Sequence, residues 1–245
     1  MLNGIPPPAS VAAQGALLLD FDGTLVPIAG RPDAVEVPGE TIALLRQLHR
    51  RLGGALAIVT GRDLATLDRL LAPLVLPAAG EHGLALRRRV GGGVELAAPH
   101  VLPEVLCAAG QAIATAHPGT VLELKRAGIA LHYRAVPGAA VSLLAAMCAL
   151  VAGHPGHELL PGHMLLEIRP RGIDKGGAVR ALMGAAPFAG RTPIFIGDDI
   201  TDEDGIAASR ALGGFGLRMA ETFRTPDRLS DWLARIAVVQ DDSAA

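Results

Sequence analysis

Residues 16–24 read ALLLDFDGT, and this stretch decides the fold class. Its run of apolar residues is typical of a short strand that is buried on both faces, as in a parallel sheet. The run ends at Asp20, and Gly23 allows a tight turn shortly afterwards. Near the end of a strand, residues two apart face the same side, so the carboxylates of Asp20 and Asp22 are expected to share one small space.

Strand and helix patterns alternate on both sides of this stretch, with short apolar runs separated by segments of helical periodicity. This β-α-β-α order predicts an α/β fold, in which helices on both faces cover a parallel sheet. The predicted strands lie at residues 16–19, 55–59, 75–78, 193–196 and 213–217. The predicted helices lie at residues 39–52, 63–71 (capped by Asp63), 175–183, from Thr201 onward, and 226–236.

The middle of the chain has a different pattern, in which two helices are interspersed with pairs of short strands around glycine-containing turns. This pattern predicts an antiparallel α+β domain inserted into the α/β chain. The predicted strand pairs are 84–88 with 94–96, 121–125 with 129–134, and 157–160 with 164–169, and the helices are 103–116 and 138–151. We therefore predict a core of residues 1–83 and 170–245, a smaller domain of residues 84–169, and a loose leader at residues 1–10.

The composition argues against several classes of function. Half of the residues are hydrophobic and the net charge is −2, so we expect a folded monomer that binds neither nucleic acid nor an anionic membrane. No apolar run is long enough to span a bilayer. Cys107 and Cys148 do not make a disulfide framework, which favours a reducing cytoplasm.

Polar clusters follow three of the predicted parallel strands: Asp20 and Asp22 the first, Thr60 the second, and Asp198 a later one. Because ligands bind at the carboxyl ends of strands in open α/β sheets, these clusters are expected to meet at one edge. Two carboxylates in one small space repel each other unless a cation lies between them, and Mg²⁺ prefers such oxygen ligands.

Two further residues complete this expected site. Asp202, near the predicted start of a helix, would add to the acidic ligand set. Lys175, at the start of another predicted helix, would place an ammonium group beside the positive end of the helix dipole. Only Lys175 and Lys125 are lysines among 22 basic residues, which suggests a specific need for an ammonium group at each.

With these residues in place, the sequence resembles the haloacid dehalogenase (HAD) superfamily. DFDGTL at residues 20–25 matches its first motif, Thr60 the second, Lys175 the third and GDDITD at 197–202 the fourth. A single short match is weak, but all four occur in order and each lies at a predicted strand or helix terminus. The resemblance covers residues 15–83 and 170–240, and it implies a HAD-like, Rossmann-type core with an inserted cap domain.

This resemblance implies a Mg²⁺-dependent phosphatase and a role for each motif residue. Asp20 attacks phosphorus to form an aspartyl phosphate, and Asp22 protonates the leaving alcohol and then activates water. Thr60 and Lys175 hold phosphoryl oxygens. The implied metal ligands are Asp20, Asp198 and the backbone carbonyl of Asp22, and the supporting residues are Asp202 and Asp199.

Further segments resemble the trehalose-6-phosphate phosphatase family in core and cap alike. They are TGR at 60–62, EHG at 81–83, ELK at 123–125, HYR at 132–134, LEIRP at 166–170, GIDKG at 172–176 and GDDITDED at 197–204. The resemblance implies an enzyme of trehalose biosynthesis whose partner is a small-molecule sugar phosphate. The residues it brings toward the substrate are Arg62, His82, Glu123, Lys125, Arg134 and Glu167, with His82 in a supporting position.

The cap residues also have a direct physical interpretation. Glu123 and Lys125 are two apart on a predicted strand and so face one side, Arg134 ends the partner strand, and Glu167 comes from the third hairpin. Carboxylates that accept hydrogen bonds from sugar hydroxyls, beside cations that donate to them, suit a disaccharide. The same four residues could instead form an exposed ion-pair face.

Two other functions stay open on the sequence. A related capped phosphatase could act on sucrose phosphate, mannosyl-phosphoglycerate or a small sugar phosphate, and a non-catalytic member could bind a sugar phosphate as a sensor. The intact Asp20, Asp22, Lys175 and Asp198 argue against the sensor. A dinucleotide-binding module is disfavoured, because the first strand is not followed by a glycine-rich loop.

Overall fold

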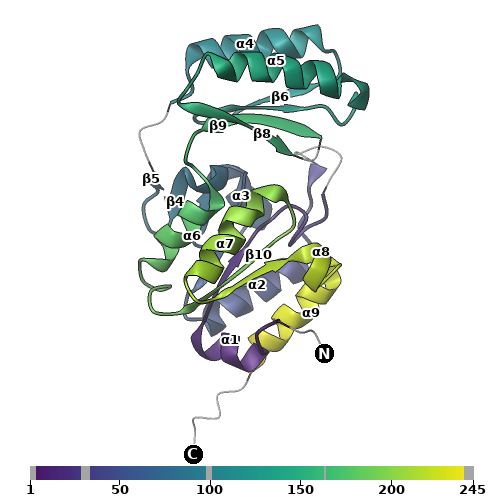
Figure 1. Ribbon diagram of the computed structural model, residues 1–245. Helices are drawn as coiled ribbons and strands as arrows, with labels where there is room; N and C mark the ends of the chain where they lie inside the picture. Colours follow the sequence, from purple (N-terminus) through teal and green to yellow (C-terminus); the bar gives the residue numbers. More distant parts are fainter. Residues whose placement is uncertain (1–3, 29–33, 98–100, 163, 240–245) are drawn as a thin grey trace, which may run out of the picture. The chain divides into compact units, whose positions relative to one another are not determined.

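The computed structural model describes residues 4–28, 34–97, 101–162 and 164–239, and the chain divides into two compact units (Figure 1). The larger unit consists of Met1–Ala97 and Asp174–Ala245, and the smaller unit is Ala98–Ile173. A discontinuous core with a continuous insert is the organisation that the sequence patterns predict. The boundaries differ from the predicted ones, since the insert begins after residue 97 rather than 83 and ends at 173 rather than 169.

Among the described residues, a seven-stranded sheet forms the centre of the larger unit, in the order β11-β10-β1-β2-β3-β4-β5. Neighbouring strands from β11 to β3 are parallel, and β4 and β5 are added antiparallel. Every residue of β1 is buried, as expected for a strand covered on both faces. The strands are β1 (Gly15–Leu19), β2 (Leu56–Val59), β3 (Ala78–Gly80), β4 (Ala85–Arg87), β5 (Glu95–Leu96), β10 (Thr192–Gly197) and β11 (Phe215–Arg218).

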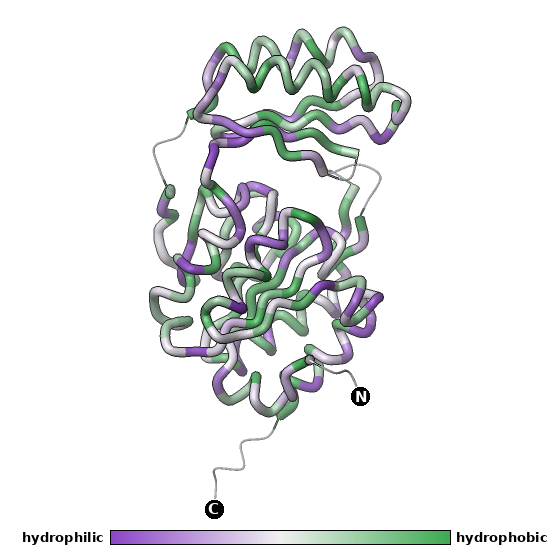
Figure 2. The backbone as a smooth tube through the Cα atoms, viewed as in Figure 1, coloured by the Kyte–Doolittle hydropathy of each residue, from purple (hydrophilic) through white to green (hydrophobic). Residues whose placement is uncertain are grey.

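Helices cover both faces of this sheet, and the α/β prediction is confirmed. The crossovers through α2 and α7 run in opposite directions from the centre of the sheet, so right-handed connections place these helices on opposite faces. On one face α6 packs with α7, and on the other α2 packs with α9. The central strands between them are strongly hydrophobic (Figure 2). The helices are α1 (Pro8–Gln14), α2 (Gly39–Arg51), α3 (Leu64–Leu71), α6 (Lys175–Met183), α7 (Glu203–Ala211), α8 (Met219–Thr222) and α9 (Pro226–Ala237).

The hairpin predicted at residues 84–96 belongs to the large sheet and not to the inserted domain. β4 pairs antiparallel with β3 across a three-residue 3₁₀ turn, η2 (Glu81–Gly83). This short connection leaves β4 beside β3, where Ala85 and Leu86 become buried. The third strand also begins later than predicted, at Ala78, because Pro77 has no N–H to donate to the ladder.

From Pro8 onward the predicted loose leader is instead part of a helix, and its residues 1–3 lie outside the described residues. Pro8 begins helix α1, since proline is tolerated in the first turn of a helix. Val11 and Ala12 are buried as the helix packs against α9. The indole N–H of Trp232 donates to the carbonyl of Pro6 at 3.3 Å, so Pro6, which precedes α1, is also held in place.

In the part of the smaller unit that the structure describes, two helices cover an antiparallel four-stranded sheet, in the order β6-β7-β9-β8. Its apolar core includes Ile129 and Leu131 from the sheet and Leu106 and Met147 from the helices. Among the described helices, none combines the length and the apolar character that a bilayer span requires. The elements are α4 (Glu104–Ala116), β6 (Val121–Leu124), β7 (Ile129–His132), η3 (Pro137–Ala139), α5 (Ala140–Ala152), β8 (His157–Gly162) and β9 (Leu165–Pro170).

Candidate active site

Three neighbouring parallel strands carry functional residues to one edge of the large sheet. β1 lies between β2 and β10 and is parallel to both. The Asp20 N–H donates to the Ile196 carbonyl and the Thr60 N–H donates to the Ala79 carbonyl, both at 2.9 Å, so the ladders continue to these residues. Asp198 follows β10 directly at the same edge. The predicted meeting of the polar clusters at the carboxyl ends of the strands is therefore what the fold produces.

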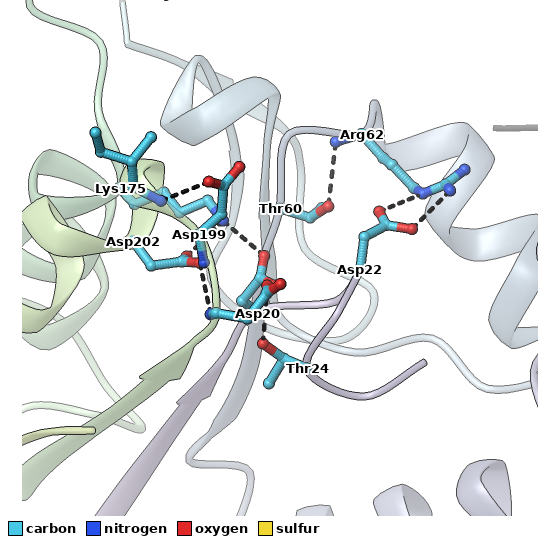
Figure 3. Close-up of polar contacts among 10 residues, drawn as sticks. Asp20, Asp22, Thr24, Thr60, Arg62, Lys175, Asp199 and Asp202 are labelled. Atoms are coloured by element: carbon cyan, nitrogen blue, oxygen red, sulfur yellow. Dashed lines mark hydrogen bonds and ion pairs between the residues drawn. The ribbon is translucent and has the colours of Figure 1, made fainter. Parts of the chain in front are cut away.

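Lys175 joins two buried carboxylates (Figure 3). Its Nζ donates to Oδ1 of Asp20 and to Oδ1 of Asp202, both at 2.6 Å, and none of the three side chains is more than 5% exposed. Lys175 is the first residue of α6, which Asp174 caps by accepting from the Gly177 N–H. Burial acts to lower the pKa of Lys175, but the charges of Asp20 and Asp202 outweigh it, and the pKa lies above its usual value. Lys175 is therefore charged and fixes the orientation of Asp20.

Asp202 positions the loop after β10. Its Oδ2 accepts from the backbone N–H groups of Asp198 and Asp199, each at 3.0 Å. Gly197 leaves room for this carboxylate, since a Cβ at that position would lie 2.2 Å from Asp202 Cγ. Asp199 in turn caps the short helix η4 (Ile200–Asp202) with its own carboxylate. Both aspartates thus hold the loop in shape, which agrees with the supporting places that the motif implied for them.

Asp20, Asp198 and Asp202 form an acidic group in which one oxygen from each lies within 4.8 Å of the others. Burial, and then the charge of Asp202, raise the pKa of Asp20 well above its usual value, although Lys175 acts in the opposite direction. Burial and the charge of Asp202 raise the pKa of Asp198 to about 6.

The donor chemistry of this group fits a divalent cation. Both oxygens of Asp202 already accept hydrogen bonds, so Asp20 and Asp198 are the carboxylates best placed to bind one. Asp198 is the exposed member of the group. Two crowded carboxylates with raised pKa values would be relieved by a hard, oxygen-binding ion such as Mg²⁺.

The turn after β1 is shaped around Asp198. Gly23 has a φ of +84°, and a Cβ there would lie 2.0 Å from Oδ2 of Asp198, so both the backbone conformation and the space require glycine. Thr24 Oγ1 donates to Oδ1 of Asp198 at 3.5 Å. Thr24 is a site residue that sequence reasoning did not single out, although it stands in the motif DFDGT.

Asp22 does not share a space with Asp20 as its position in the sequence suggested. Arg62 donates to both of its carboxylate oxygens, Nε to Oδ2 and an Nη to Oδ1, each at 2.7 Å. In Figure 3 this pair lies on one side of Asp20, and Lys175 and Asp202 lie on the other. The expectation was wrong because β1 ends at Leu19, so the alternation of an extended strand no longer applies at Asp22.

Thr60 and Arg62 are held by the turn that follows β3. The N–H of His82 donates to the Thr60 carbonyl and the N–H of Glu81 donates to the Arg62 carbonyl, both at 2.9 Å. Glu81 and His82 have positive φ angles of 48° and 59°, a conformation that costs about 1 kcal/mol or more at residues with a Cβ. Thr60 Oγ1 accepts from the Arg62 N–H at 3.1 Å, which leaves its own proton for another acceptor. His82 therefore supports the end of β2, and its predicted place near the substrate stays a prediction.

In the smaller unit, charged residues share one face of the sheet. Glu123 and Glu167 are both level with Ala130 of the intervening strand β7, so their side chains point to the same side. Lys125 Nζ lies 2.9 Å from Oε1 of Glu167, and His132 Nε2 lies 2.8 Å from Oε2 of Glu123. We call Glu123, Lys125, His132 and Glu167 the polar sheet face.

The polar sheet face contains one residue that sequence reasoning passed over. His132 stands in the quoted segment HYR, and its spacing of two from Arg134 could have placed it beside Glu123. Burial acts to raise the pKa of Glu123, but the His132 hydrogen bond and the Lys125 charge bring it below its usual value. Arg134 lies two residues beyond the end of β7. The structure places Glu123, Lys125 and Glu167 on one face, which both interpretations of the pattern required.

Comparisons with known proteins identify a family for this chain. The model of the trehalose-phosphatase family matches residues 18–223. A probable trehalose-phosphate phosphatase of Sinorhizobium fredii is 44% identical over 205 residues, which cover 83% of this chain and 77% of that protein. Trehalose-6-phosphate phosphatase of Escherichia coli is 38% identical over 210 residues, which cover 85% and 79%.

Solved structures share the fold. The C-terminal domain of Candida albicans trehalose-6-phosphate phosphatase aligns with a TM-score of 0.77 at 20% identity, over 97% of this chain and 100% of that one. A haloacid dehalogenase-like hydrolase from Bacteroides thetaiotaomicron aligns with a TM-score of 0.60 at 16% identity, over 91% and 99%. The fold is therefore that of the haloacid dehalogenase-like class. Within this class, the chain belongs to the trehalose-phosphatase family, whose model matches most of its length.

Proposed function

We propose that this enzyme hydrolyses trehalose 6-phosphate to trehalose and inorganic phosphate, with Mg²⁺ and through an aspartyl phosphate on Asp20. The observation that carries the proposal is the buried Asp20–Lys175–Asp202 arrangement beside Asp198 at the sheet edge. Membership of the trehalose-phosphatase family and the names of its relatives support the substrate.

Asp20 is the nucleophile. Its position is fixed by the 2.6 Å hydrogen bond from Lys175, and a fixed orientation reduces the entropy lost on reaching the transition state. One carboxylate oxygen attacks phosphorus, the bond from phosphorus to the sugar oxygen breaks, and the phosphoryl group is left on Asp20. Asp20, Asp198 and the Asp22 carbonyl would hold Mg²⁺, which would supply positive charge to offset the negative charge of the phosphoryl oxygens.

Asp22 acts as the general acid and then as the general base. It gives a proton to the departing sugar oxygen and later takes one from the water that attacks phosphorus. That attack breaks the bond between phosphorus and the Asp20 oxygen and releases phosphate. The Thr60 hydroxyl and the Lys175 ammonium donate to the phosphoryl oxygens during both steps.

The polar sheet face and Arg134 recognise the disaccharide. Their carboxylates accept hydrogen bonds from sugar hydroxyls, and Lys125 and Arg134 donate to them. The pairing of Lys125 with Glu167 and of His132 with Glu123 presets the orientation of these groups, which lowers the entropic cost of binding. The intact motif residues and the family support this reaction over the binding-only sensor, and sucrose phosphate and mannosyl-phosphoglycerate are the competing substrates.

A phosphate-release assay tests the proposal. Trehalose 6-phosphate, sucrose 6-phosphate, mannosyl-3-phosphoglycerate and glucose 6-phosphate are each supplied with Mg²⁺ or with excess EDTA. We expect turnover of trehalose 6-phosphate that EDTA abolishes and Mg²⁺ restores. Equal turnover of the four esters would contradict the assignment of trehalose 6-phosphate as the substrate. Undiminished turnover in EDTA would contradict the dependence on Mg²⁺.

A further inference from the structure

The hydrogen bonds between Arg62 and Asp22 occupy both oxygens of the group proposed to act as acid and base. The two contacts, each 2.7 Å, form a bidentate pair, which is the strongest common geometry for a guanidinium and a carboxylate. In this arrangement the carboxylate of Asp22 is oriented toward Arg62. The described conformation is therefore one in which Asp22 is not available for the reaction.

Arg62 is well supported in this position. Its guanidinium carbon lies 5.8 Å from the centre of the Phe21 ring, a cation–π contact. Its backbone N–H donates to Thr60 Oγ1 and its carbonyl accepts from the Glu81 N–H. Arg62 is also the less exposed partner, at 13% against 34% for Asp22. Arg62 is thus the fixed partner and Asp22 the one with room to move.

We propose that Arg62 is a positioning residue that holds Asp22 away from the phosphoryl group until the sugar part of the substrate binds. This inference rests on the proposed function. The sugar then accepts hydrogen bonds from Arg62, and Asp22 turns to the ester oxygen. Binding energy from a part of the substrate that does not react is used in this way to prepare the reacting centre. An ester without hydroxyl groups leaves Asp22 on Arg62.

The test compares two substrates in wild type and in Arg62→Met, a variant that keeps the apolar stem and removes the donors. Trehalose 6-phosphate carries the sugar, and p-nitrophenyl phosphate carries none. We expect kcat/KM for trehalose 6-phosphate to fall about tenfold or more, since a charged hydrogen-bond donor is lost. We expect kcat for p-nitrophenyl phosphate to rise about two- to fivefold, the size of effect that a partly exposed ion pair has.

If the activities toward the two substrates change in opposite directions, Arg62 acts as a positioning residue and does not merely stabilise the structure. If both substrates lose activity together, or if p-nitrophenyl phosphate turnover is unchanged, the proposal is overturned. The double variant Asp22→Asn/Arg62→Met is expected to show no gain, because the gain requires the freed Asp22. Arg62→Lys, which keeps the charge but not the bidentate geometry, is expected to lie between wild type and Arg62→Met.

A matched control removes another arginine–carboxylate pair from the larger unit. Arg88 contacts Glu95 at 3.1 Å, and Arg88→Met is expected to leave both substrates unchanged. If wild type hydrolyses p-nitrophenyl phosphate but not trehalose 6-phosphate, the proposed substrate fails. The p-nitrophenyl phosphate measurements on the Arg62 variants still decide the role of Arg62 in that case.

Discussion

The two units of this protein use charged side chains in different ways. In the larger unit, Lys175 joins Asp20 and Asp202, which come from separate segments of the chain and are almost fully buried. In the smaller unit, Lys125 and His132 each contact one carboxylate from the same small sheet. In the first arrangement one ammonium group is shared by two carboxylates. In the second, the Lys125–Glu167 and His132–Glu123 contacts lie on one sheet face, and Glu167 is buried as well. This difference suggests that the first suits chemistry and the second suits recognition.

The largest effect is expected from Asp20→Asn. The amide keeps the shape of the carboxylate but is no nucleophile, so we expect kcat to fall by about 10⁴-fold or more. Steady-state phosphate release from trehalose 6-phosphate measures it. Asp227→Asn, an exposed change in the first turn of α9, is the matched control and is expected to keep full activity. Turnover of Asp20→Asn within tenfold of wild type would mean that another group is the nucleophile.

The two lysines allow a direct comparison of the units. Lys175→Met leaves two buried carboxylates without their cation, and removal of one partner from a buried ion pair costs about 3–5 kcal/mol. Lys125→Met leaves one buried carboxylate, that of Glu167, without this contact, and we expect a smaller loss of about 1–3 kcal/mol. Urea unfolding at neutral pH measures both free energies. If the two variants lose equal free energies of unfolding, or if Lys125→Met loses more, the proposed difference between the two units is contradicted.

Substrate recognition by the polar sheet face predicts a split between kinetic constants. Lys125→Met is expected to raise KM for trehalose 6-phosphate about tenfold and to change kcat little, because the lost contact is made equally in the ground and transition states. Turnover of p-nitrophenyl phosphate should not change. Glu104→Gln, on the exposed side of α4, is the control. A fall in kcat for both esters would contradict a role of Lys125 in substrate recognition.

The smallest effect concerns Mg²⁺ and pH. Asp20 and Asp198 have folded-state pKa values above the usual value, about 6 for Asp198, so the metal-free fold loses stability as pH rises from about 4 through 6. Mg²⁺ replaces the protons and removes this loss. We therefore expect Mg²⁺ to raise Tm by about 2–4 °C at pH 7.5 and by less at pH 5. Differential scanning calorimetry with and without Mg²⁺ measures the rise in Tm at each pH. An equal rise at the two pH values would contradict the replacement of protons by Mg²⁺ as its cause.

Much of the site could be predicted from one sequence because each residue stands at the end of a recognisable element. Asp20 follows a buried apolar run, Asp198 follows another, and Lys175 begins a helix, so the fold class alone brings them to one edge. The hydrophobic pattern is enough for this step, since a short run of apolar residues marks a strand that is buried on both faces.

Contacts between residues at this edge were harder to predict, because they depend on the direction in which each side chain points. The partner of Asp22 is Arg62, 40 positions away, and neither propensity nor spacing names it. The same holds for Thr24 with Asp198. The β4 hairpin was assigned to the wrong unit because its pattern is that of any antiparallel pair, and only its pairing with β3 places it.

By itself, the sequence determined the α/β core, the inserted α+β unit and the residues that gather at the carboxyl edge of the sheet. It could do so because apolar periodicity and element ends are local properties of the chain. Only the tertiary structure decided which oxygens of Asp202 hold Lys175 and the loop, and that Asp22 turns to Arg62 rather than to Asp20. These choices depend on distances between segments remote in sequence, and hydrogen bonds depend on such distances to within a few tenths of an ångström.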